Sequence, residues 1–71
     1  MMNWVETPES SNIARFGYDA TAQVLTVEFK SAGTYDYFDV PEPVFEQMKA
    51  APSKGQFLAS NIKGIYRYAR Q

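Results

Sequence analysis

The segment 23–29 alternates apolar and polar side chains more regularly than any other part of the chain. Leu25, Val27 and Phe29 fall on one side, and polar residues separate them. A period of two is typical of a β-strand with one buried face. A chain of 71 residues has room for one domain with one modest core. The fold must therefore bring other elements against this strand.

Two further segments are predicted to be strands that flank it. The segment 13–18 carries Phe16 and Tyr18 on one face, and the polar turn 19–22 follows it. The segment 34–40 alternates again and ends at Pro41. Short turns between successive strands favour an antiparallel meander.

The length of the turn at 30–33 decides which face the paired tyrosines occupy. A two- or four-residue turn places Phe38 and Val40 with the apolar face of segment 23–29, and leaves Tyr35 and Tyr37 on the outer face. A three-residue turn that ends in glycine reverses this assignment and is chemically reasonable. Sorting of apolar residues favours the first register, because it gathers five of them on one face.

Two short helices are predicted after the strands. Pro41 and Pro43 fit the first turn of a helix, where the backbone N–H groups have no internal partner. The segment 53–56, Ser-Lys-Gly-Gln, has the form of a capping box that begins a second helix. Gly64 is predicted to end that helix.

The fold class predicted from these signals is α+β. It comprises a three-stranded antiparallel β-meander, two short helices and a short C-terminal extended segment at 65–68 as a candidate edge strand. The single domain is expected over 10–71, and 1–9 is expected to be a loose N-terminal lead-in that docks Trp4 on the domain edge.

The chain contains neither cysteine nor histidine. This excludes disulfides, thiolate or imidazole catalysis and the usual structural zinc sites. Acid–base catalysis by a pair of carboxylates is the remaining alternative, because Glu28 and Asp36 become cross-strand neighbours in the three-residue register. We nevertheless predict a non-enzymatic domain that needs no cofactor and no metal. No basic residue precedes Arg15, and no apolar stretch is long enough for a signal or a membrane span, so cytoplasm is the expected location.

Charge is divided unevenly along the chain. Before Lys49, eight acidic residues face only Arg15 and Lys30, a net charge of −6; from Lys49 onward five cations meet no acid, a net charge of +5. The basic segment either stays on display for a polyanion or folds back over the acidic sheet and neutralises it. The five cations are Lys49, Lys54, Lys63, Arg67 and Arg70.

Candidate binding residues follow from this division. Tyrosines supply flat rings for unpaired bases, and cations supply contacts for phosphate. The start of the second predicted helix adds free N–H groups beside a lysine, a simple anion site. Each group also has an ordinary structural explanation, as core tyrosines or as a plain helix cap. The candidates are Tyr35, Tyr37, Ser53, Lys54, Gly55, Lys63, Tyr66, Arg67, Tyr68 and Arg70.

Several short motifs occur in an order and spacing that resemble the KTSC domain, over about Ser10 to Tyr68. That domain occurs at the carboxyl end of some lysyl-tRNA synthetases and as a lone bacterial protein. The resemblance implies no catalytic residues, and it suggests RNA binding from the attachment to a synthetase. The motifs are Ser11-Asn12-Ile13, Gly17-Tyr18-Asp19, Leu25-x-Val27-x-Phe29, Tyr35-x-Tyr37-Phe38, Val40-Pro41, Ala51-Pro52-Ser53-Lys54-Gly55-x-Phe57, Ile62 and Tyr66-x-Tyr68.

One position departs from the family's pattern. The family often has a basic residue between the central tyrosines, whereas this chain has Asp36. An acid beside a stacking pair repels phosphate. Two hypotheses therefore stand: a non-catalytic module that binds RNA, either tRNA or single-stranded, or a module that binds a protein partner or a second copy of itself through an edge strand or the tyrosine face.

Overall fold

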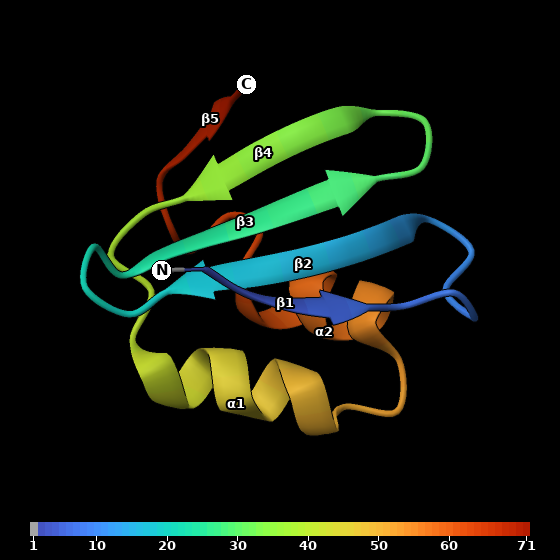
Figure 1. Ribbon diagram of the computed structural model, residues 1–71, viewed down its shortest axis with the longest axis horizontal. Helices are drawn as coiled ribbons and strands as arrows, with labels where there is room; N and C mark the ends of the chain where they lie inside the picture. The colour runs from blue at the N-terminus through green and yellow to red at the C-terminus, as the bar shows by residue number, and fades with distance from the viewer. Residues whose placement is uncertain (1) are drawn as a thin grey trace.

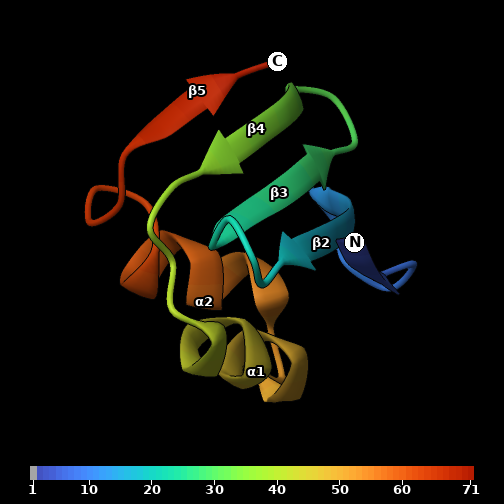
Figure 2. The same ribbon diagram turned by 60° about the vertical axis from the view of Figure 1, so that its left-hand side comes forward.

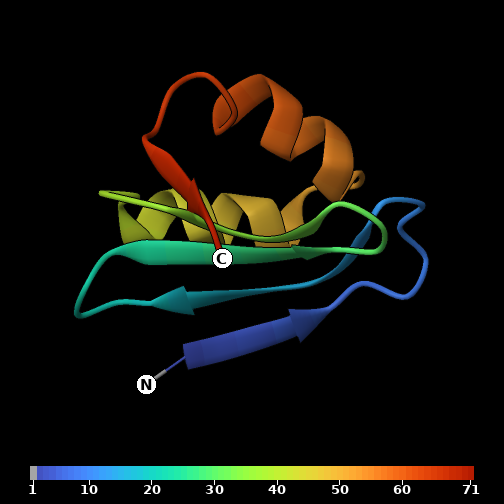
Figure 3. The same cartoon turned by 90° about the horizontal axis from the view of Figure 1, so that it is seen from above.

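A computed structural model describes residues 2–71. Five strands form one antiparallel sheet in the sequential order β1-β2-β3-β4-β5 (Figure 1). Both helices lie on one side of this sheet and leave the other face open (Figure 3). The elements are β1 (Met2–Glu6), β2 (Ile13–Asp19), β3 (Val24–Phe29), β4 (Gly33–Tyr37), α1 (Glu42–Ala50), α2 (Lys54–Asn61) and β5 (Tyr68–Arg70).

The α+β class and the two helices after the meander are confirmed, but the sheet has five strands in place of three. Residues expected to form a loose lead-in make β1, which pairs with β2. Trp4 lies opposite Gly17, and a Cβ atom on Gly17 would stand 2.8 Å from the indole ring. Because Gly17 has no side chain, the Trp4 ring can lie over it. The Arg15 guanidinium covers the indole at 4.1 Å from the ring centroid.

A C-terminal edge strand is present, but its predicted bounds of 65–68 are wrong, because β5 spans Tyr68–Arg70 and 65–67 lie outside any strand. It lies beside β4, as Figure 2 shows. Two backbone bonds extend this pairing past the strand ends. The Phe38 N–H donates to the Arg67 carbonyl at 2.9 Å, and the Gln71 N–H donates to the Thr34 carbonyl at 2.8 Å.

The favoured register of the β3–β4 hairpin is wrong. Leu25 lies opposite Tyr37, and Val27 lies opposite Tyr35, so both tyrosines share the inner, helix-bearing face with the apolar residues of β3. The reason is the length of the turn, which comprises the three residues 30–32. The next residue, Gly33, begins β4 and has a φ of +93°. A left-handed φ costs glycine little, so this turn is accessible here.

Of the two residues expected to fill that face, only Val40 reaches the core, and it does so by another route. The strand ends at Tyr37, and Asp39 adopts a left-handed φ of +59°. This reversal returns Val40 to the core, where it is fully buried, while Phe38 is only half-buried. One local bend therefore lets the tyrosines and Val40 occupy the same side of the sheet.

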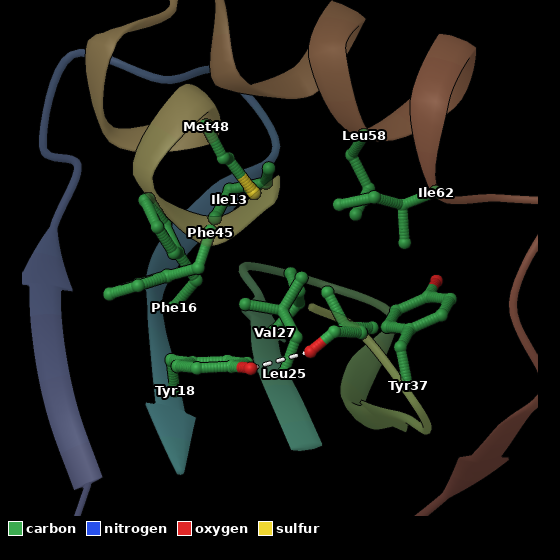
Figure 4. Packing of buried hydrophobic residues seen from close by; sticks show 11 residues of the cluster. Ile13, Phe16, Tyr18, Leu25, Val27, Tyr37, Phe45, Met48, Leu58 and Ile62 are labelled. Carbon is green, nitrogen blue, oxygen red and sulfur yellow. Dashed lines mark hydrogen bonds between the residues drawn. The ribbon is translucent and has the colours of Figure 1, made fainter. Parts of the chain in front are cut away.

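The core lies between the inner face of the sheet and the two helices (Figure 4). Phe45 of α1 stacks on Tyr18 with ring centroids 4.9 Å apart, and meets Phe16 edge-on at 5.8 Å. The Tyr18 hydroxyl donates a hydrogen bond to the Val40 carbonyl oxygen at 2.5 Å. The core residues are Ile13, Phe16, Tyr18, Leu25, Val27, Tyr37, Val40, Phe45, Met48, Leu58 and Ile62.

The helix starts follow the predicted signals. Pro41 is the N-cap of α1, and Pro43 lies in its first turn. The Gln56 N–H donates to Ser53 Oγ at 3.3 Å, which is one half of the capping box. Gly64 adopts φ +78° shortly after α2 ends. Neither helix is long and apolar enough to cross a membrane, considering the residues that the structure describes.

Candidate binding cleft

A cleft of about 600 Å³ lies on the inner face at the β3–β5 end of the sheet. Four aromatic side chains from three strands line it, and the loop after α2 closes one side with Lys63 and Gly64. The β3–β4 turn adds Ser31 and Ala32, and Asn12 completes the lining. We call this space the aromatic cleft; its rings belong to Phe29, Tyr35, Tyr37 and Tyr68.

The four rings form a continuous lining. Phe29 meets Tyr35 edge-on with centroids 5.6 Å apart. Tyr68 lies 5.8 Å from Tyr35 and 5.9 Å from Tyr37, tilted against both. Tyr37 is only 3% exposed, whereas Tyr68 is 61% exposed. The lining therefore runs from a buried floor at Tyr37 to an accessible rim at Tyr68.

The Tyr37 hydroxyl is a polar group at this floor. It makes no hydrogen bond to another residue within 2–71, and it is not sealed from solvent. Its accessible surface therefore opens into the cleft that the ring lines. Burial raises the pKa of Tyr37, and the neighbouring hydroxyls of Tyr35 and Tyr68 raise it further. The group is thus a neutral phenol that can donate or accept a hydrogen bond.

Two cations stand at the end of the cleft nearest the β3–β4 turn. Lys63 Nζ lies 5.7 Å from the centroid of the Phe29 ring. Arg70 covers Gly33: if Gly33 carried a Cβ atom, that atom would lie 3.4 Å from Arg70 Nε. Phe29 and Gly33 are direct cross-strand partners, so Lys63 and Arg70 cover adjacent positions of one sheet end. Neither forms an ion pair with any residue in 2–71.

The other tail cations are arranged differently. Arg67 pairs with Asp39 at 3.2 Å and lies over the Phe38 ring at 5.4 Å, away from the cleft lining. Lys49 pairs with Glu46 on α1 at 3.1 Å. The basic half of the sequence is therefore neither wholly displayed nor wholly neutralised.

The helix-start candidates lie elsewhere. Ser53, Lys54 and Gly55 line a second, shallower hollow of about 490 Å³ at the start of α2. Lys54 Nζ donates a hydrogen bond at 2.8 Å to the carbonyl oxygen of Ala51, the C-cap residue of α1, so the ammonium is engaged by the preceding helix. A Cβ on Gly55 would stand 2.9 Å from Asn12 Oδ1. Asn12 thus lies between this hollow and the aromatic cleft, whose linings it shares.

The structure brings together only some of the predicted candidates. Tyr35, Tyr37, Lys63 and Tyr68 meet in the aromatic cleft, with Arg70 at its end. Tyr66 is half-buried against the core. Sequence reasoning missed Phe29 and Asn12 as part of the site. The alternation of segment 23–29 marked Phe29 only as a core residue, and nothing near Asn12 in sequence indicates its position.

Asp36 points away from the tyrosines. It lies on the open outer face, where its carboxylate accepts a hydrogen bond from Thr26 Oγ1 at 2.6 Å and from Gln71 Nε2 at 2.9 Å. Glu28 lies on that face too and pairs with Arg15 at 2.9 Å. The two acids are not direct cross-strand partners, since Glu28 lies opposite Thr34 and Asp36 lies opposite Thr26. Within residues 2–71, no three side chains of Asp or Glu gather where they could hold a metal ion.

Comparisons with known proteins match this fold to one family. The family model described as the KTSC domain matches residues 9–68. A crystal structure of a KTSC domain protein from Yersinia pestis superimposes with a TM-score of 0.94 and is 34% identical, covering 100% of this chain and 99% of that one.

Sequence relatives include both large and small proteins. The lysine–tRNA ligase of Trichormus variabilis is 48% identical over 61 residues, which is 86% of this chain. The match spans only 11% of the ligase. An uncharacterised protein of Stutzerimonas stutzeri is 38% identical over 87% of this chain and 89% of its own length.

Proposed function

The chain belongs to the KTSC domain family, and we propose that it is a non-catalytic module that binds single-stranded RNA. In this proposal bases enter the aromatic cleft and phosphates bind Lys63 and Arg70. The observation that carries it is the combination of an aromatic lining with two cations that have no acidic partner in the described chain.

The chemistry of the cleft supports this proposal. Unpaired bases stack on aromatic side chains, and a stacked base contributes roughly 1–3 kcal/mol. Phosphates need nearby cations, and Lys63 and Arg70 lie at the same end of the cleft. Asp36, the acid that would oppose RNA, lies on the opposite face of the sheet.

The relatives suggest which RNA to test. Three similar proteins are named lysine–tRNA ligases, and this chain matches a small segment of each. We therefore propose tRNA, and in particular its unpaired nucleotides, as the first candidate.

The test is RNA affinity at two salt concentrations, measured by fluorescence anisotropy with a labelled single-stranded RNA and a tRNA. Two phosphate contacts predict a loss of about sevenfold in affinity between roughly 50 and 200 mM salt, because bound counterions are released. The double variant Lys63→Ala/Arg70→Ala should lose most of the affinity and most of the salt dependence. Lys49→Ala is the matched control, because that lysine pairs with Glu46 on α1. Absence of binding at low salt, or equal affinity of the double variant, would contradict the proposal.

A second candidate function rests on the edge strand β1. Its five residues include one charge, Glu6, and no proline, so it lacks the usual protection against pairing with another strand. Trp4 within it is 41% exposed. We propose self-association through β1 as the alternative, to be tested by sedimentation over a wide concentration range. A mass that rises with concentration, and falls back in Asn3→Lys, would support it; a constant monomer mass would contradict it.

A further inference from the structure

We infer that the aromatic cleft holds one nucleotide with its base unstacked, so that each domain contacts RNA at a single inserted base. This inference rests on the proposed RNA binding and makes it specific. The base lies against Tyr68, its polar edge meets the Tyr37 hydroxyl, and its phosphate lies between Lys63 and Arg70.

The dimensions of the cleft favour one base. Pockets that enclose small molecules have volumes of about 300–1,000 Å³, and the aromatic cleft measures about 600 Å³. A run of stacked bases requires an open platform of rings, as on the exposed face of a sheet. Here the rings instead face the helix side, where Gly64 and Lys63 of the loop after α2 stand opposite them.

The gradient of exposure gives the base a direction of entry. Tyr68 is 61% exposed at the rim and contacts both inner tyrosines, whereas Tyr37 is 3% exposed at the floor. A planar ring that slides along Tyr68 gains stacking area before its far edge reaches the floor. In Figure 4 Tyr37 lies on the same side of the core as Ile62, and its hydroxyl points away from Tyr18.

The Tyr37 hydroxyl gives the floor chemical selectivity. The ring beneath it is buried among apolar neighbours, and the hydroxyl itself is open to the solvent that a ligand would displace. A ligand that offers a ring nitrogen or a carbonyl oxygen at this point gains a hydrogen bond that an apolar ring cannot make. A nucleobase has such an edge, and an aromatic hydrocarbon does not.

The phosphate position follows from the sheet. Lys63 lies over Phe29, and Arg70 lies over Gly33. Phe29 of β3 and Gly33 of β4 are cross-strand partners. Both cations therefore stand at one end of the ring-lined floor, about where the sugar–phosphate of an inserted base would leave the cleft. Their charges are available, since no carboxylate within residues 2–71 pairs with either.

The direct test is a ¹H–¹⁵N NMR titration with the four nucleoside 5′-monophosphates, the parent nucleosides and inorganic phosphate. A monophosphate should shift the amide signals of Ser31, Ala32, Gly64 and Tyr68 in a saturable way. The Trp4 indole signal should stay constant, because this ring lies on the outer face. The nucleoside should bind more weakly at the same amides. Equal shifts with inorganic phosphate alone would overturn base insertion.

Two variants separate stacking from hydrogen bonding. Tyr68→Ala should weaken monophosphate binding by about tenfold or more, since it removes the stacking ring; its exposure makes it tolerable to the fold. Tyr37→Phe keeps the ring and should weaken binding by about three- to tenfold, with unequal effects among the four bases. Arg67→Ala is the control, because Arg67 engages Asp39. Equal affinities in all three variants would overturn the inference.

The titration also distinguishes failure of this inference from failure of the proposed function. If single-stranded RNA binds in a salt-dependent way but monophosphates shift no cleft signal, RNA binding stands and the inserted base is wrong. If neither RNA nor monophosphates bind, both are wrong. Competition of a monophosphate against labelled RNA is expected if both are right.

Discussion

The hydroxyl of Tyr18 donates a hydrogen bond to the carbonyl oxygen of Val40, 2.5 Å away and across 22 positions of sequence. Tyr18 lies in β2, and Val40 lies in the connection between β4 and α1. Both are almost fully buried. This contact fixes the point at which the chain leaves the sheet and enters the helical layer, one residue after the left-handed bend at Asp39.

Replacing Tyr18 by phenylalanine should lower the free energy of unfolding by about 1–3 kcal/mol, because the buried Val40 carbonyl loses its donor. The ring and its stacking on Phe45 are retained, so the fold should persist. Urea denaturation followed by circular dichroism measures the change. Tyr68→Phe is the matched control, since that hydroxyl lies on an exposed side chain. Similar losses in both variants would contradict this assignment.

Stability should fall in alkaline solution. Burial raises the pKa of Tyr18 above its ordinary value of 10.0, and the charges of Glu42 and Asp19 raise it further; burial likewise raises the pKa of Tyr37. Below pH 10 both folded and unfolded chains keep these protons. Above it the unfolded chain loses them first, so the free energy of unfolding decreases as pH rises.

The measurement is the urea midpoint from neutral pH to beyond pH 10. Tyr18→Phe should show a shallower alkaline decline than the unmodified protein, because one of the two buried phenols is gone. The comparison cancels the titration of lysines, which is common to both chains. Parallel declines would show that Tyr18 does not carry the effect.

Replacing Gly17 by alanine should destabilise the β1–β2 pairing. The new Cβ would stand 2.8 Å from Trp4 and 3.0 Å from Met2 Cε, so the indole must move. We expect a cost of about 1–3 kcal/mol from overpacking and a red shift of tryptophan fluorescence as the ring becomes hydrated. In a Trp4→Ala background the same substitution should cost little, and an equal cost there would contradict the proposed clash.

Asp36→Asn should leave RNA affinity within about twofold of the unmodified protein, because Asp36 faces the outer side of the sheet and is not in the cleft lining. Anisotropy titration at low salt measures this. Lys63→Ala provides the positive control for sensitivity. A marked gain in affinity for Asp36→Asn would show that RNA reaches the outer face, contrary to the proposed site.

Elements that are determined by nearby residues could be predicted from the sequence. Pro41 and Ser53 begin the helices, and the alternation of segment 23–29 identified β3. β1 escaped prediction because its position depends on Gly17, which accommodates Trp4 from thirteen residues away in sequence. No pattern within 2–6 contains that information.

The site was predictable in its residue types and not in its geometry. Tyrosines and cations were singled out from the sequence, and three of those tyrosines meet Lys63 in the cleft. The face of Tyr35 and Tyr37, however, depends on the three-residue turn that ends at Gly33, and the bend at Asp39 separately places Val40. A one-residue change in turn length reverses both faces. The number of apolar residues gathered on one face favoured the wrong register. That comparison assumed a regular strand as far as Val40, whereas a separate bend at Asp39 returns Val40 to the core.

The rim of the cleft is carried by the shortest strand of the sheet. β5 has three residues, all exposed, and backbone hydrogen bonds at each end attach it to the β4 edge. Separating this strand disrupts little buried surface, so it requires far less free energy than unfolding the core. Under the proposed binding, access to the cleft would depend on local release of β5, an equilibrium separate from unfolding of the core. Substitutions in β5 can retune the first without eroding the second.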